Sequence, residues 1–392
     1  MLRMKIATLL FTYHRSWHTE QVINALKHNT ALPQKLFVFQ DGQKEDEDIA
    51  EWDKVNNLIH SIDWCDTEIW VSECNRGLAA SIVTGITYVF EKYDALIVLE
   101  DDCVPGVSFM DFMYQCFEKY QDNKKIFSVS GYAYPVVLEK PIHDIYGCGR
   151  VSSWGWGTWK DRWEYFERDY ELVKKLRQEK ESSRNLAIWG MDLESMLVGN
   201  VRGECDSWAA FWALNVVAKE GICINPHESL IKNIGFDGSG VHSGVTDYYD
   251  VSLMANDKQI FELPDEVYIT EETVEAFAPL FGSYTALNCD ENDKEKILVY
   301  GLGNFYLRAE ERICEEYYVE AFVDRVKKGW FAGKPIIKCK DIEKYTYDKI
   351  LVMILDSKDC LEVKEQLKQQ GIEPEKILDG NILYKLEYGF KQ

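Results

Sequence analysis

The sequence predicts an α/β protein built around a largely parallel β-sheet that helices cover on both faces. Through the first hundred residues, short runs rich in Ile, Val, Leu, Phe and Trp alternate with longer stretches of helical periodicity. Strand, helix and strand in repetition are typical of a parallel sheet, because a long crossover must join parallel neighbours. Each apolar run also ends in polar or acidic residues, and ligands gather at these carboxyl ends of the strands.

Four strands and three helices are expected in this first part of the chain. The strands are residues 5–11, 35–39, 67–71 and 95–99. The helices are residues 17–29, 48–61 and 78–93. In the last helix Leu78, Ile82 and Ile86 recur at helical spacing. The polar strand ends are residues 12–15, 41–42 and 100–102.

Composition excludes several classes of protein. The chain has 392 residues, and its 44 Lys and Arg against 66 Asp and Glu give a net charge of −22. A hydrophobic fraction of 46% is that of a globular protein, which excludes wholesale disorder. The acid excess argues against a nucleic-acid partner and against broad binding to anionic membranes, because both need a basic face.

The cysteines and the N-terminus indicate where the protein works. The 11 cysteines contain no C-x-x-C pair, so we expect reduced thiols rather than disulfides or a zinc cluster. The apolar stretch near the N-terminus is too short for a signal peptide or a membrane span. We expect a cytoplasmic protein with no integral membrane segment, and peripheral attachment at the inner membrane face stays open. The oligomeric state also stays open.

The segment ALIVLEDD, residues 95–102, is the most informative part of the sequence. Glu100, Asp101 and Asp102 emerge together at the end of a buried strand. Neighbouring carboxylates repel one another by about 1 kcal/mol per pair at ~4 Å even in water, so a site that gathers them normally holds a cation. Their hard oxygen ligands suit Mg or Mn that also contacts a diphosphate. The alternative is a strand-end loop whose acids are simply solvated.

Four motifs in order extend this observation to a family resemblance. FTYHR, FQDG, ECNRGLA and VLEDD together resemble the nucleotide-sugar-binding half of GT-A glycosyltransferases. Within that group they are most similar to the inverting family 2 enzymes and the N-acetylglucosaminyltransferase I type. The resemblance covers roughly residues 4–245. It implies a mixed sheet flanked by helices, a nucleotide-sugar donor, and a Mn or Mg ion that bridges the donor's diphosphate.

Carried over by position, the resemblance implies a role for each acid at the strand end. Asp102 would be the direct metal ligand. Glu100 and Asp101 would support it and contact the ribose or the sugar. Thr12 and Arg15 would line the nucleotide pocket, although Thr12 could equally be an ordinary strand-end hydroxyl.

The resemblance also implies which residues contact the nucleobase and the phosphates of the donor. Asp41 would accept a hydrogen bond from a uracil-type base, and Arg76 and Gly77 would lie beside the base and the donor phosphates. Arginine is a rigid cationic fork suited to phosphate, and glycine lets the backbone come close. The alternatives are an ordinary turn at residues 41–42 and a surface cation at Arg76.

The segment GRVSSWGWGTWKDRW, residues 149–163, predicts the acceptor side. The glycines between its tryptophans favour a sharply bent loop over a continuous helix. Aromatic faces stack on sugar rings, so Trp154 and Trp156 are expected to bind a carbohydrate acceptor. The alternative, that the tryptophans fill the gap between sheet and helices, is stronger for Trp159 and Trp163. The segment also looks like the acceptor-side loop of bacterial glycosyltransferases of this group.

An inverting transfer needs a general base for the acceptor hydroxyl, and Asp206 is the predicted one. It precedes an aromatic helix, and it stands where the family's catalytic acid follows the tryptophan loop. Burial beside Trp208 and Trp212 would raise its pKa to a useful value. Asp206 could instead be the N-cap of that helix, and Asp192 and Glu194 are rival bases.

A glycine-rich segment, residues 234–243, ends near His242. In several GT-A families a late histidine completes the metal shell, so His242 is a predicted second metal ligand. An imidazole can join carboxylates on Mn. The alternative is a solvated loop histidine.

The C-terminal part predicts a second domain. Apolar strands and one helix recur from residue 294, which predicts a GT-A domain at residues 1–262, a linker at 263–293 and a small Rossmann-like domain of open role at 294–392. Gly301 and Gly303 begin a dinucleotide-binding pattern, and Asp324 has the spacing of a ribose-binding acid. Tyr306 occupies the third glycine position, so NAD binding is not expected.

These observations predict a metal-dependent glycosyltransferase, a hexosyltransferase of bacterial type. It would move a sugar from a nucleotide-sugar donor, a UDP-sugar in the first instance, to a hydroxyl of a glycan or glycoconjugate, with inversion. A nucleotidyltransferase is the alternative from another enzyme class, but the first strand lacks a Gly-rich phosphate loop with a Lys. A non-catalytic sugar-nucleotide-binding protein is the third.

Overall fold

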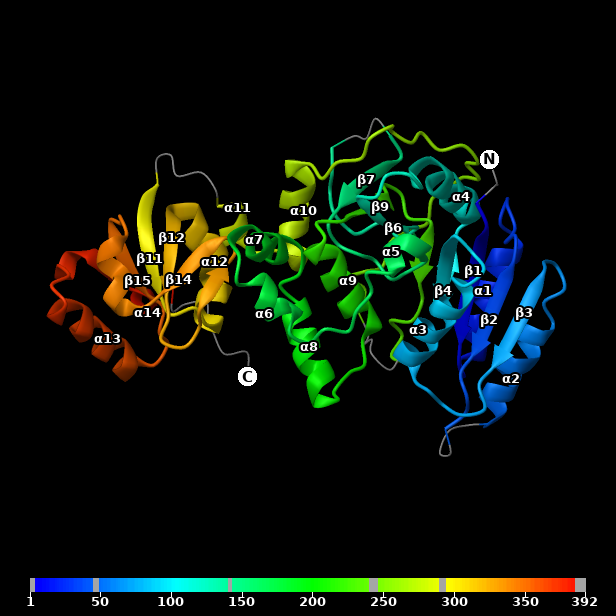
Figure 1. Cartoon of the computed structure of the whole chain (residues 1–392), viewed down its shortest axis with the longest axis horizontal. Coiled ribbons are helices and arrows are strands. Elements are labelled where there is room, and N and C mark those ends of the chain that lie inside the picture. The colour runs from blue at the N-terminus through cyan, green and yellow to red at the C-terminus, as the bar shows by residue number, and fades with distance from the viewer. Residues whose placement is uncertain (1–3, 45–48, 140–142, 240–245, 289–293, 385–392) are drawn as a thin grey trace. The chain divides into compact units, whose positions relative to one another are not determined.

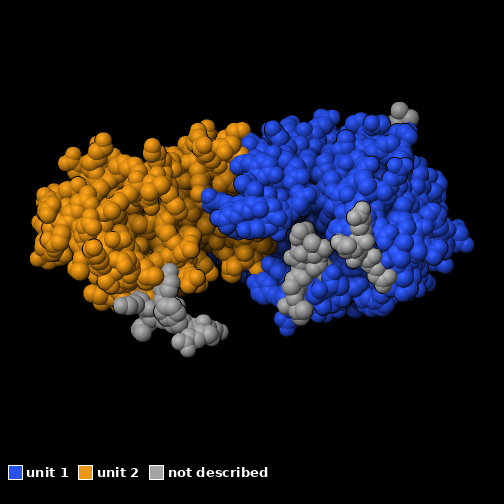
Figure 2. Space-filling view, turned by 90° about the horizontal axis from the view of Figure 1, so that it is seen from below, with its two compact units in different colours: residues 1–170, 193–276 blue, residues 171–192, 277–392 orange. Residues whose placement is uncertain are grey.

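The structure is a computed structural model that describes residues 4–44, 49–139, 143–239, 246–288 and 294–384. The chain forms two compact units, which Figure 2 colours separately. Unit 1 consists of residues 1–170 and 193–276, and unit 2 of residues 171–192 and 277–392. Among the described helices, none has the length and apolar character that crossing a membrane requires.

Unit 1 contains two sheets and the helices around them (Figure 1). Its strands are β1 (Ile6–Thr12), β2 (Leu36–Gln40), β3 (Thr67–Val71), β4 (Ala95–Glu100), β5 (Cys103–Pro105), β6 (Ile126–Ser130), β7 (Ile145–Cys148), β8 (Trp156–Trp159), β9 (Ile222–Pro226) and β10 (Ile231–Asn233). Its helices are α1 (Ser16–Lys27), α2 (Ile49–His60), α3 (Leu78–Val89), α4 (Phe109–Tyr120), α5 (Lys160–Trp163), α8 (Leu193–Arg202), α9 (Trp208–Ala218) and the first half of α10 (Glu271–Phe281).

The main sheet of unit 1 has eight strands in the order β3-β2-β1-β4-β8-β6-β9-β7. The first four are parallel to one another. β8 is antiparallel to β4 and β6, and β7 is antiparallel to β9. The predicted α/β class with a mixed sheet and flanking helices is therefore confirmed, and the four expected strands each lie within one residue of the observed ones.

The central strands are buried because helices pack on the sheet. Every residue of β1 is buried, and so are five of the six residues of β4. Continuous apolar runs of this kind are typical of parallel strands covered on both faces. α3 packs on β1 and contacts α9. Gly85 allows this close packing, because a Cβ there would lie 2.9 Å from the Phe11 ring.

A short second sheet connects a later segment to the end of β4. β10 pairs with β5 in antiparallel fashion, with Asn233 opposite Cys103. Because β5 directly follows Asp102, this pairing places the residues after β10 beside the acidic strand end.

Unit 2 contains one six-stranded sheet and its helices. Its strands are β11 (Glu295–Tyr300), β12 (Tyr317–Val323), β13 (Gly329–Phe331), β14 (Lys334–Ile337), β15 (Lys349–Val352) and β16 (Ile377–Asp379). Its helices are α6 (Leu172–Leu176), α7 (Lys180–Trp189), the second half of α10, α11 (Tyr284–Leu287), α12 (Asn304–Glu316), α13 (Ser357–Gln369) and α14 (Gly380–Tyr384), with 3-10 turns η1 (Cys339–Lys344) and η2 (Pro374–Lys376).

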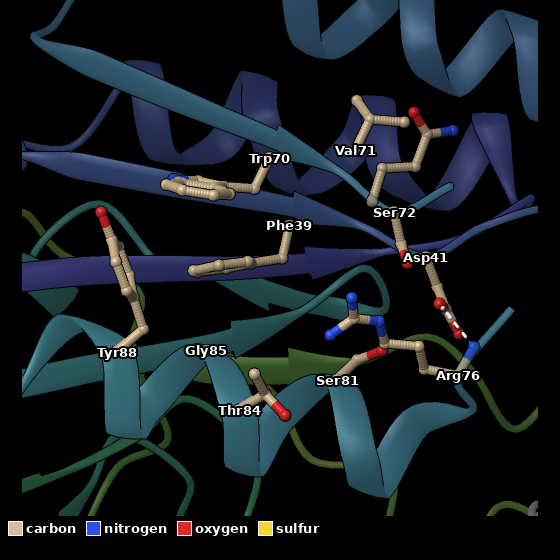
Figure 3. A pocket seen from close by; sticks show the side chains of 11 residues that line it. Phe39, Asp41, Trp70, Val71, Ser72, Arg76, Ser81, Thr84, Gly85 and Tyr88 are labelled. Carbon is tan, nitrogen blue, oxygen red and sulfur yellow. Dashed lines mark hydrogen bonds between the residues drawn. The ribbon is translucent and has the colours of Figure 1, made fainter. Parts of the chain in front are cut away.

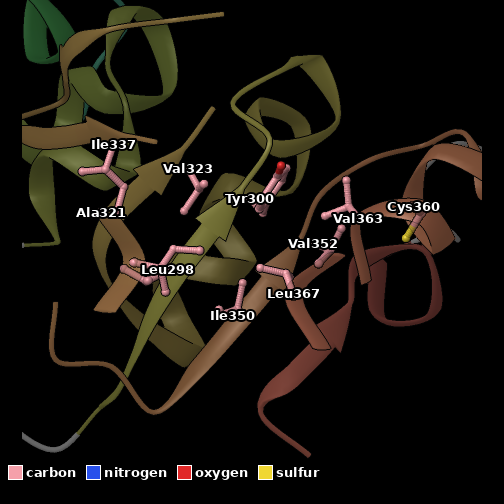
Figure 4. Close-up of a cluster of buried hydrophobic side chains, with 11 residues drawn as sticks. Leu298, Tyr300, Ala321, Val323, Ile337, Ile350, Val352, Cys360, Val363 and Leu367 are labelled. Carbon is pink, nitrogen blue, oxygen red and sulfur yellow. The ribbon is translucent and has the colours of Figure 1, made fainter. Parts of the chain in front are cut away.

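The sheet of unit 2 has the order β13-β14-β12-β11-β15-β16, and all neighbours but β13 and β14 are parallel. Alternate residues of β11, β12 and β15 bury one face against α13, which contributes Val363 and Leu367 (Figure 4). Tyr306 is fully buried on α12 and packs edge-on against Phe322 of β12.

The two units divide the chain differently from the predicted boundaries at residues 262 and 294. Residues 171–192, which the sequence assigned to the first domain, pack with unit 2, where α7 contacts β13, β14 and α11. The Trp330 amide donates to the Arg177 carbonyl at 2.8 Å. The predicted linker contains α10 and α11.

Candidate functional site

The carboxyl ends of β1 and β4 meet at the point where the strand order reverses. From β1 the chain continues to β2 and β3 on one side, and it returns to β4 on the other side of β1. Phe11 of β1 lies opposite Glu100 of β4. The residues that follow these two strands therefore emerge at the same edge, in the crevice where open α/β sheets bind ligands.

Arg15 joins the two aspartates at this edge. Its Nη2 atom donates to Asp102 Oδ2 at 2.7 Å and also to Asp101 Oδ1, and its Nε atom donates to Asp101 Oδ2 at 3.3 Å. The side chains are 15% exposed for Arg15 and Asp102 and 8% for Asp101. Arg15 Nη1 is buried and makes no hydrogen bond within the described residues. The predicted residues Arg15, Asp101 and Asp102 are thus brought together.

Burial shifts the pKa values of the ionisable side chains at this edge. Burial, and then the neighbouring Asp102 and Asp101 carboxylates, raises the pKa of Glu100 to about 8. Burial also raises the pKa of Asp101, while Arg15 opposes that shift. Although burial disfavours its charge, the two aspartates raise the pKa of Arg15 well above its ordinary value. Arg15 therefore stays cationic and supplies the positive charge of this edge.

The segment after β10 covers Asp102. The Ile234 amide donates to the Asp102 carbonyl at 2.9 Å. At Gly235 a Cβ would lie 2.2 Å from Asp102 Oδ2, so any larger residue there would displace the Asp102 carboxylate. Asp237 Oδ2 lies 3.0 Å from Nε2 of the buried His18. His18 and Gly235 belong to the site although the sequence interpretation did not select them.

Four aromatic side chains gather beside this covering segment, and we call Tyr132, Trp154, Phe236 and Tyr249 the aromatic platform. The Trp154 ring lies 4.6 Å from Tyr132, 5.4 Å from Phe236 and 5.5 Å from Tyr249, all edge to face. The Tyr132 hydroxyl donates to the Tyr249 carbonyl at 2.9 Å. Trp154, Phe236 and Tyr249 are partly exposed. Because Phe236 follows Gly235, the platform lies next to Asp102.

Trp156 requires a correction. It is fully buried in β8, opposite Val98 of β4, and its ring stacks on Trp208 at 5.1 Å. A buried ring cannot contact an acceptor, so the predicted acceptor role of Trp156 gives way to a core role. Trp159 and Trp163 are also buried. Trp156 belongs to β8, whereas Trp154 precedes the strand. The sequence did not indicate where the strand begins, so it could not show that the two tryptophans have different roles.

Asp206 lies close to the tryptophan loop, but its surroundings differ from the prediction. Its side chain is 52% exposed and pairs with Arg168 at 2.6 Å. Trp208, two residues later, stacks on Trp156, which places the start of α9 beside β8. The expected burial of Asp206 is therefore wrong, and its role as the base stays a prediction. The N-cap of α9 is Ser207, whose hydroxyl accepts from the Ala210 amide.

Hydrogen bonds to the Asp41 carboxylate connect the end of β2 to the loop before α3. Its Oδ1 atom accepts from the amides of Gly42 and Arg76, and its Oδ2 atom accepts from the Gly77 amide, each at 2.9 Å. The carboxylate is buried. These bonds use most of its acceptor capacity and also occupy the Gly77 amide. Asp41, Arg76 and Gly77 are thus brought together by contacts among themselves, and their roles toward the donor stay predictions.

Thr12 lies beneath the same edge. Its side chain is 5% exposed, and its hydroxyl donates to the Phe39 carbonyl at 3.3 Å. This bond ties β1 to β2, which agrees with the strand-end alternative.

A cavity of about 200 Å³ opens between β2, β3 and α3 (Figure 3). Phe39 and Trp70 line it from the sheet, and Tyr88 closes one end from α3. Arg76 extends into the opposite end from the loop before α3. The guanidinium is exposed and makes no hydrogen bond or ion pair within the described part of the chain. The aromatic Trp70 and Tyr88 were missed from the sequence, because both read as ordinary strand and helix residues.

The predicted metal site does not fit the observed arrangement. Carboxylates are suitable ligands for Mg or Mn, but Arg15 occupies the position between Asp101 and Asp102 that a cation would take. Across the described residues, no three His, Cys, Asp or Glu side chains converge as metal ligands would. His242, the second predicted ligand, lies outside the described residues. Among the rival bases, Asp192 belongs to unit 2 and Glu194 to the first turn of α8 in unit 1.

Part of the chain matches one known family, and its fold is weakly similar to solved structures. A family model described as C2185-like, N-terminal, matches residues 293–378. No curated protein matches the chain. Among solved structures, the chain is similar to residues 1–349 of TarS from S. aureus in complex with UDP-GlcNAc, with 8% identity, a TM-score of 0.36 and 58% of each chain covered.

A second similar structure is the mannosyltransferase PcManGT from Pyrobaculum calidifontis in complex with GDP-Man and Mn²⁺. Identity is 11%, the TM-score is 0.28, and the alignment covers 45% of this chain and 47% of that one. The chain thus spans less than two thirds of the length of these structures. The similarities are low, and the function proposed below rests on the residues of this chain.

Proposed function

We propose that unit 1 is a glycosyltransferase that moves a sugar from a nucleotide-sugar donor to a hydroxyl of a glycan or glycoconjugate. The observation that carries the proposal is the group formed by Arg15, Asp101 and Asp102 at the switch point of the parallel strands, beside the aromatic platform. A cation at a switch point suits a diphosphate, and an aromatic surface next to it suits a sugar ring. The cytoplasmic location expected from the sequence stays part of the proposal.

The leaving group would be held at Arg15. As the bond between the anomeric carbon and the diphosphate breaks, the electron pair remains on the diphosphate oxygen. In this proposal the guanidinium of Arg15 offsets that growing charge, and its buried Nη1 atom, which has no partner in the described residues, would have to be uncovered by a movement of the residues around it. The Mn or Mg ion expected from the family resemblance has no part in this proposal, because Arg15 already occupies the position between Asp101 and Asp102.

The acceptor would bind at the aromatic platform, with Trp154 as the predicted contact. Its hydroxyl oxygen forms the new bond to the anomeric carbon on the face opposite the diphosphate, which gives inversion. Asp206 takes the hydroxyl proton in this proposal. Its exposure and its ion pair with Arg168 mean that the acceptor must displace Arg168 before the carboxylate can act.

The proposal is tested with the purified full chain and a panel of nucleotide sugars, with and without Mn²⁺. We expect release of a nucleoside diphosphate, reduced about a hundredfold in Asp102→Ala, because Asp102 holds the Arg15 guanidinium in position for the leaving group. Asp206→Asn is expected to keep donor binding and to lose about a hundredfold or more in transfer. Asp66→Ala, at an exposed surface acid paired with Lys35, is the matched control that retains activity.

Other products identify the alternatives. Release of pyrophosphate would indicate a nucleotidyltransferase. Tight nucleotide-sugar binding without turnover would indicate a binding protein. A wild-type chain that binds no nucleotide sugar under any of these conditions would rule the proposal out.

A further inference from the structure

The turn between β12 and β13 is strongly basic in an otherwise acidic chain. Residues 324–340 contain six Lys and Arg against one acid, which gives a net charge of +5, whereas the whole chain carries −22. Residues 325–328, with the sequence Arg-Val-Lys-Lys, form the exposed tip of this turn, and we call them the cationic turn. Charges more than about 10 Å away are largely screened at moderate salt, so a partner at this turn responds mainly to the local positive charge.

Two side chains fix the backbone of the cationic turn. Asp324 Oδ1 accepts from the amides of Val326 and Lys327, each at 2.8 Å. Lys338 Nζ donates to the carbonyls of Asp324 and Arg325 at 2.9 Å. It also donates to the Lys327 carbonyl at 3.3 Å. The turn is therefore ordered before a partner binds, which lowers the entropy cost of binding.

A segment from another part of unit 2 adds positive charge beside the turn. Arg177 directly follows α6, and the Trp330 amide donates to its carbonyl. A Cβ at Gly329 would lie 2.3 Å from the same carbonyl oxygen. The Arg177 guanidinium lies 6.0 Å from the Phe331 ring. Arg177 is therefore a neighbour of Gly329, the residue that follows the cationic turn.

The neighbouring acids of α13 act on one residue of the turn, Arg325. A hydrogen bond with Tyr300 raises the pKa of Arg325, and the Glu362 and Asp359 carboxylates of α13 act in the same direction. Arg325 is thus held by groups of unit 2 itself. The two lysines of the cationic turn are exposed, and they are the cations that a partner meets first.

Val326 gives the cationic turn an apolar tip. Its side chain is 83% exposed, and it stands between Arg325 and Lys327. An apolar residue flanked by cations suits the surface of an anionic bilayer, where the apolar side chain enters the boundary of the acyl chains and the cations contact the phosphates of the headgroups. A single-stranded nucleic acid would favour aromatic side chains for stacking, and the sequence of the cationic turn contains none.

We propose that the cationic turn docks unit 2 on an anionic lipid bilayer. Val326 enters the boundary between headgroups and acyl chains. Lys327 and Lys328 contact the lipid phosphates, and Arg177 adds to the attraction. Each cation near an anionic surface strengthens binding about fivefold, so a few of them with one apolar contact give a reversible attachment that salt weakens.

Flotation of the full chain with lipid vesicles tests this surface. We expect binding to vesicles of phosphatidylglycerol and phosphatidylcholine in equal parts, and none to phosphatidylcholine alone. Replacing both Lys327 and Lys328 by Gln is expected to weaken binding about twenty-fivefold. Val326→Ser, which leaves the charge unchanged, is expected to weaken it about fivefold. No donor or acceptor is added, so the result does not depend on the proposed activity of unit 1.

The matched control replaces both Lys124 and Lys125 by Gln, since these are adjacent exposed lysines of unit 1 and the change in charge is the same. This variant is expected to bind the vesicles as the wild type does. Equal losses in the two double variants would overturn the proposal, and so would a wild-type chain that does not bind the anionic vesicles or a Val326→Ser variant that binds like the wild type. Binding of single-stranded RNA, but not of vesicles, through Lys327 and Lys328 would identify another class of partner and would also overturn it.

Discussion

Arg15 determines the charge balance of the acidic strand edge. Three carboxyl groups lie within three consecutive residues, and Asp101 is almost fully buried. One guanidinium contacts both aspartates, and the pKa of Glu100 is raised to about 8 by burial and by these neighbours. A glutamic acid that keeps its proton at neutral pH, and a cation between the other two acids, together allow the cluster to persist.

Replacing Arg15 by Gln is expected to destabilise unit 1 by about 3 kcal/mol, because removing one partner of a buried pair leaves the other charge uncompensated. Urea unfolding at neutral pH measures the loss. Adding Asp101→Asn to Arg15→Gln is expected to recover part of it, since the buried charge is then removed as well. Mn²⁺ is expected to stabilise Arg15→Gln more than the wild type, because the aspartates are free to bind it.

The control is Lys54→Gln, which breaks the exposed pair with Glu51 and is expected to cost less than about 1 kcal/mol. Equal losses in the two variants would show that the Arg15 pair behaves as a surface pair. If Mn²⁺ does not raise the free energy of unfolding of Arg15→Gln, the aspartates do not bind a metal even when Arg15 is absent.

Asp41 illustrates what a sequence can and cannot predict about one residue. The motif placed an acid at the end of β2, and the structure has it there. Its partners depend on the path of residues 75–77, which approach from a distant part of the chain. A carboxylate at a strand end can face a ligand or the backbone with equal local propensity, so the sequence left both interpretations open.

At the scale of elements, α12 is connected to α11 by a buried carboxylate. Glu310 is 5% exposed, and its Oε1 atom accepts from the Thr285 amide at 3.1 Å and from the hydroxyls of Ser283 and Thr285. Burial raises the pKa of Glu310, although these hydrogen bonds act in the opposite direction. The short helix α11 is therefore joined to α12 through hydrogen bonds to one titratable group.

The stability of the folded chain is expected to depend on pH through Glu310. Because the folded pKa of Glu310 lies above the ordinary value of 4.5, its contribution to stability is complete below that value and decreases as pH rises through the raised pKa. Glu310→Gln cannot titrate. As pH rises from about 4.5 towards neutrality, we expect the free energy of unfolding of the wild type to fall relative to that of Glu310→Gln. Chemical unfolding of the full chain at several pH values measures it.

Glu316→Gln, at an exposed position of the same helix, is the control and is expected to follow the wild type at every pH. A difference between Glu310→Gln and the wild type that stays constant with pH would contradict the prediction. It would mean that Glu310 keeps the same protonation in the folded and unfolded chain.

The sequence predicted some elements well and others poorly, for a physical reason. β1 to β4 and the helices between them follow from local periodicity, because each strand is a continuous apolar run. β8 consists of four residues, Trp156–Trp159, and it enters the sheet between β4 and β6 in the antiparallel sense. That insertion depends on contacts between distant segments, so the segment read as a loop and Trp156 was assigned to the acceptor.

At the scale of the whole molecule, the division of the chain into units was the least predictable feature. Strand-like apolar runs resume just after residue 294, where β11 begins at Glu295, and the boundary was predicted there. The structure adds α6 and α7 to unit 2, although they precede α8 and α9 of unit 1 in the chain. Short amphipathic helices carry no local signal for the sheet they cover, so their membership could not be predicted.

Because α7 belongs to unit 2, a substitution in α7 is expected to destabilise unit 2 and to leave unit 1 intact. Trp189 is 2% exposed, its ring lies 5.6 Å from Phe277, and α7 packs on β13 and β14. Trp189→Ala is expected to cost about 3–5 kcal/mol through the cavity it leaves. Hydrogen exchange of the full chain should then show amides of β11, β12 and β15 losing protection by roughly a hundredfold or more, while β1 to β4 keep theirs.

The matched variant is Trp212→Ala, since Trp212 is fully buried in α9 of unit 1 and its ring lies 5.1 Å from Trp163. It is expected to have the opposite effect, with protection lost in unit 1 and kept in β11, β12 and β15. If the units are energetically separate, the two tryptophans report on different sheets despite lying 23 residues apart in the sequence. If Trp189→Ala lowers protection equally in both sheets, the units unfold as one, and residues 171–192 must be regarded as part of a single cooperative structure.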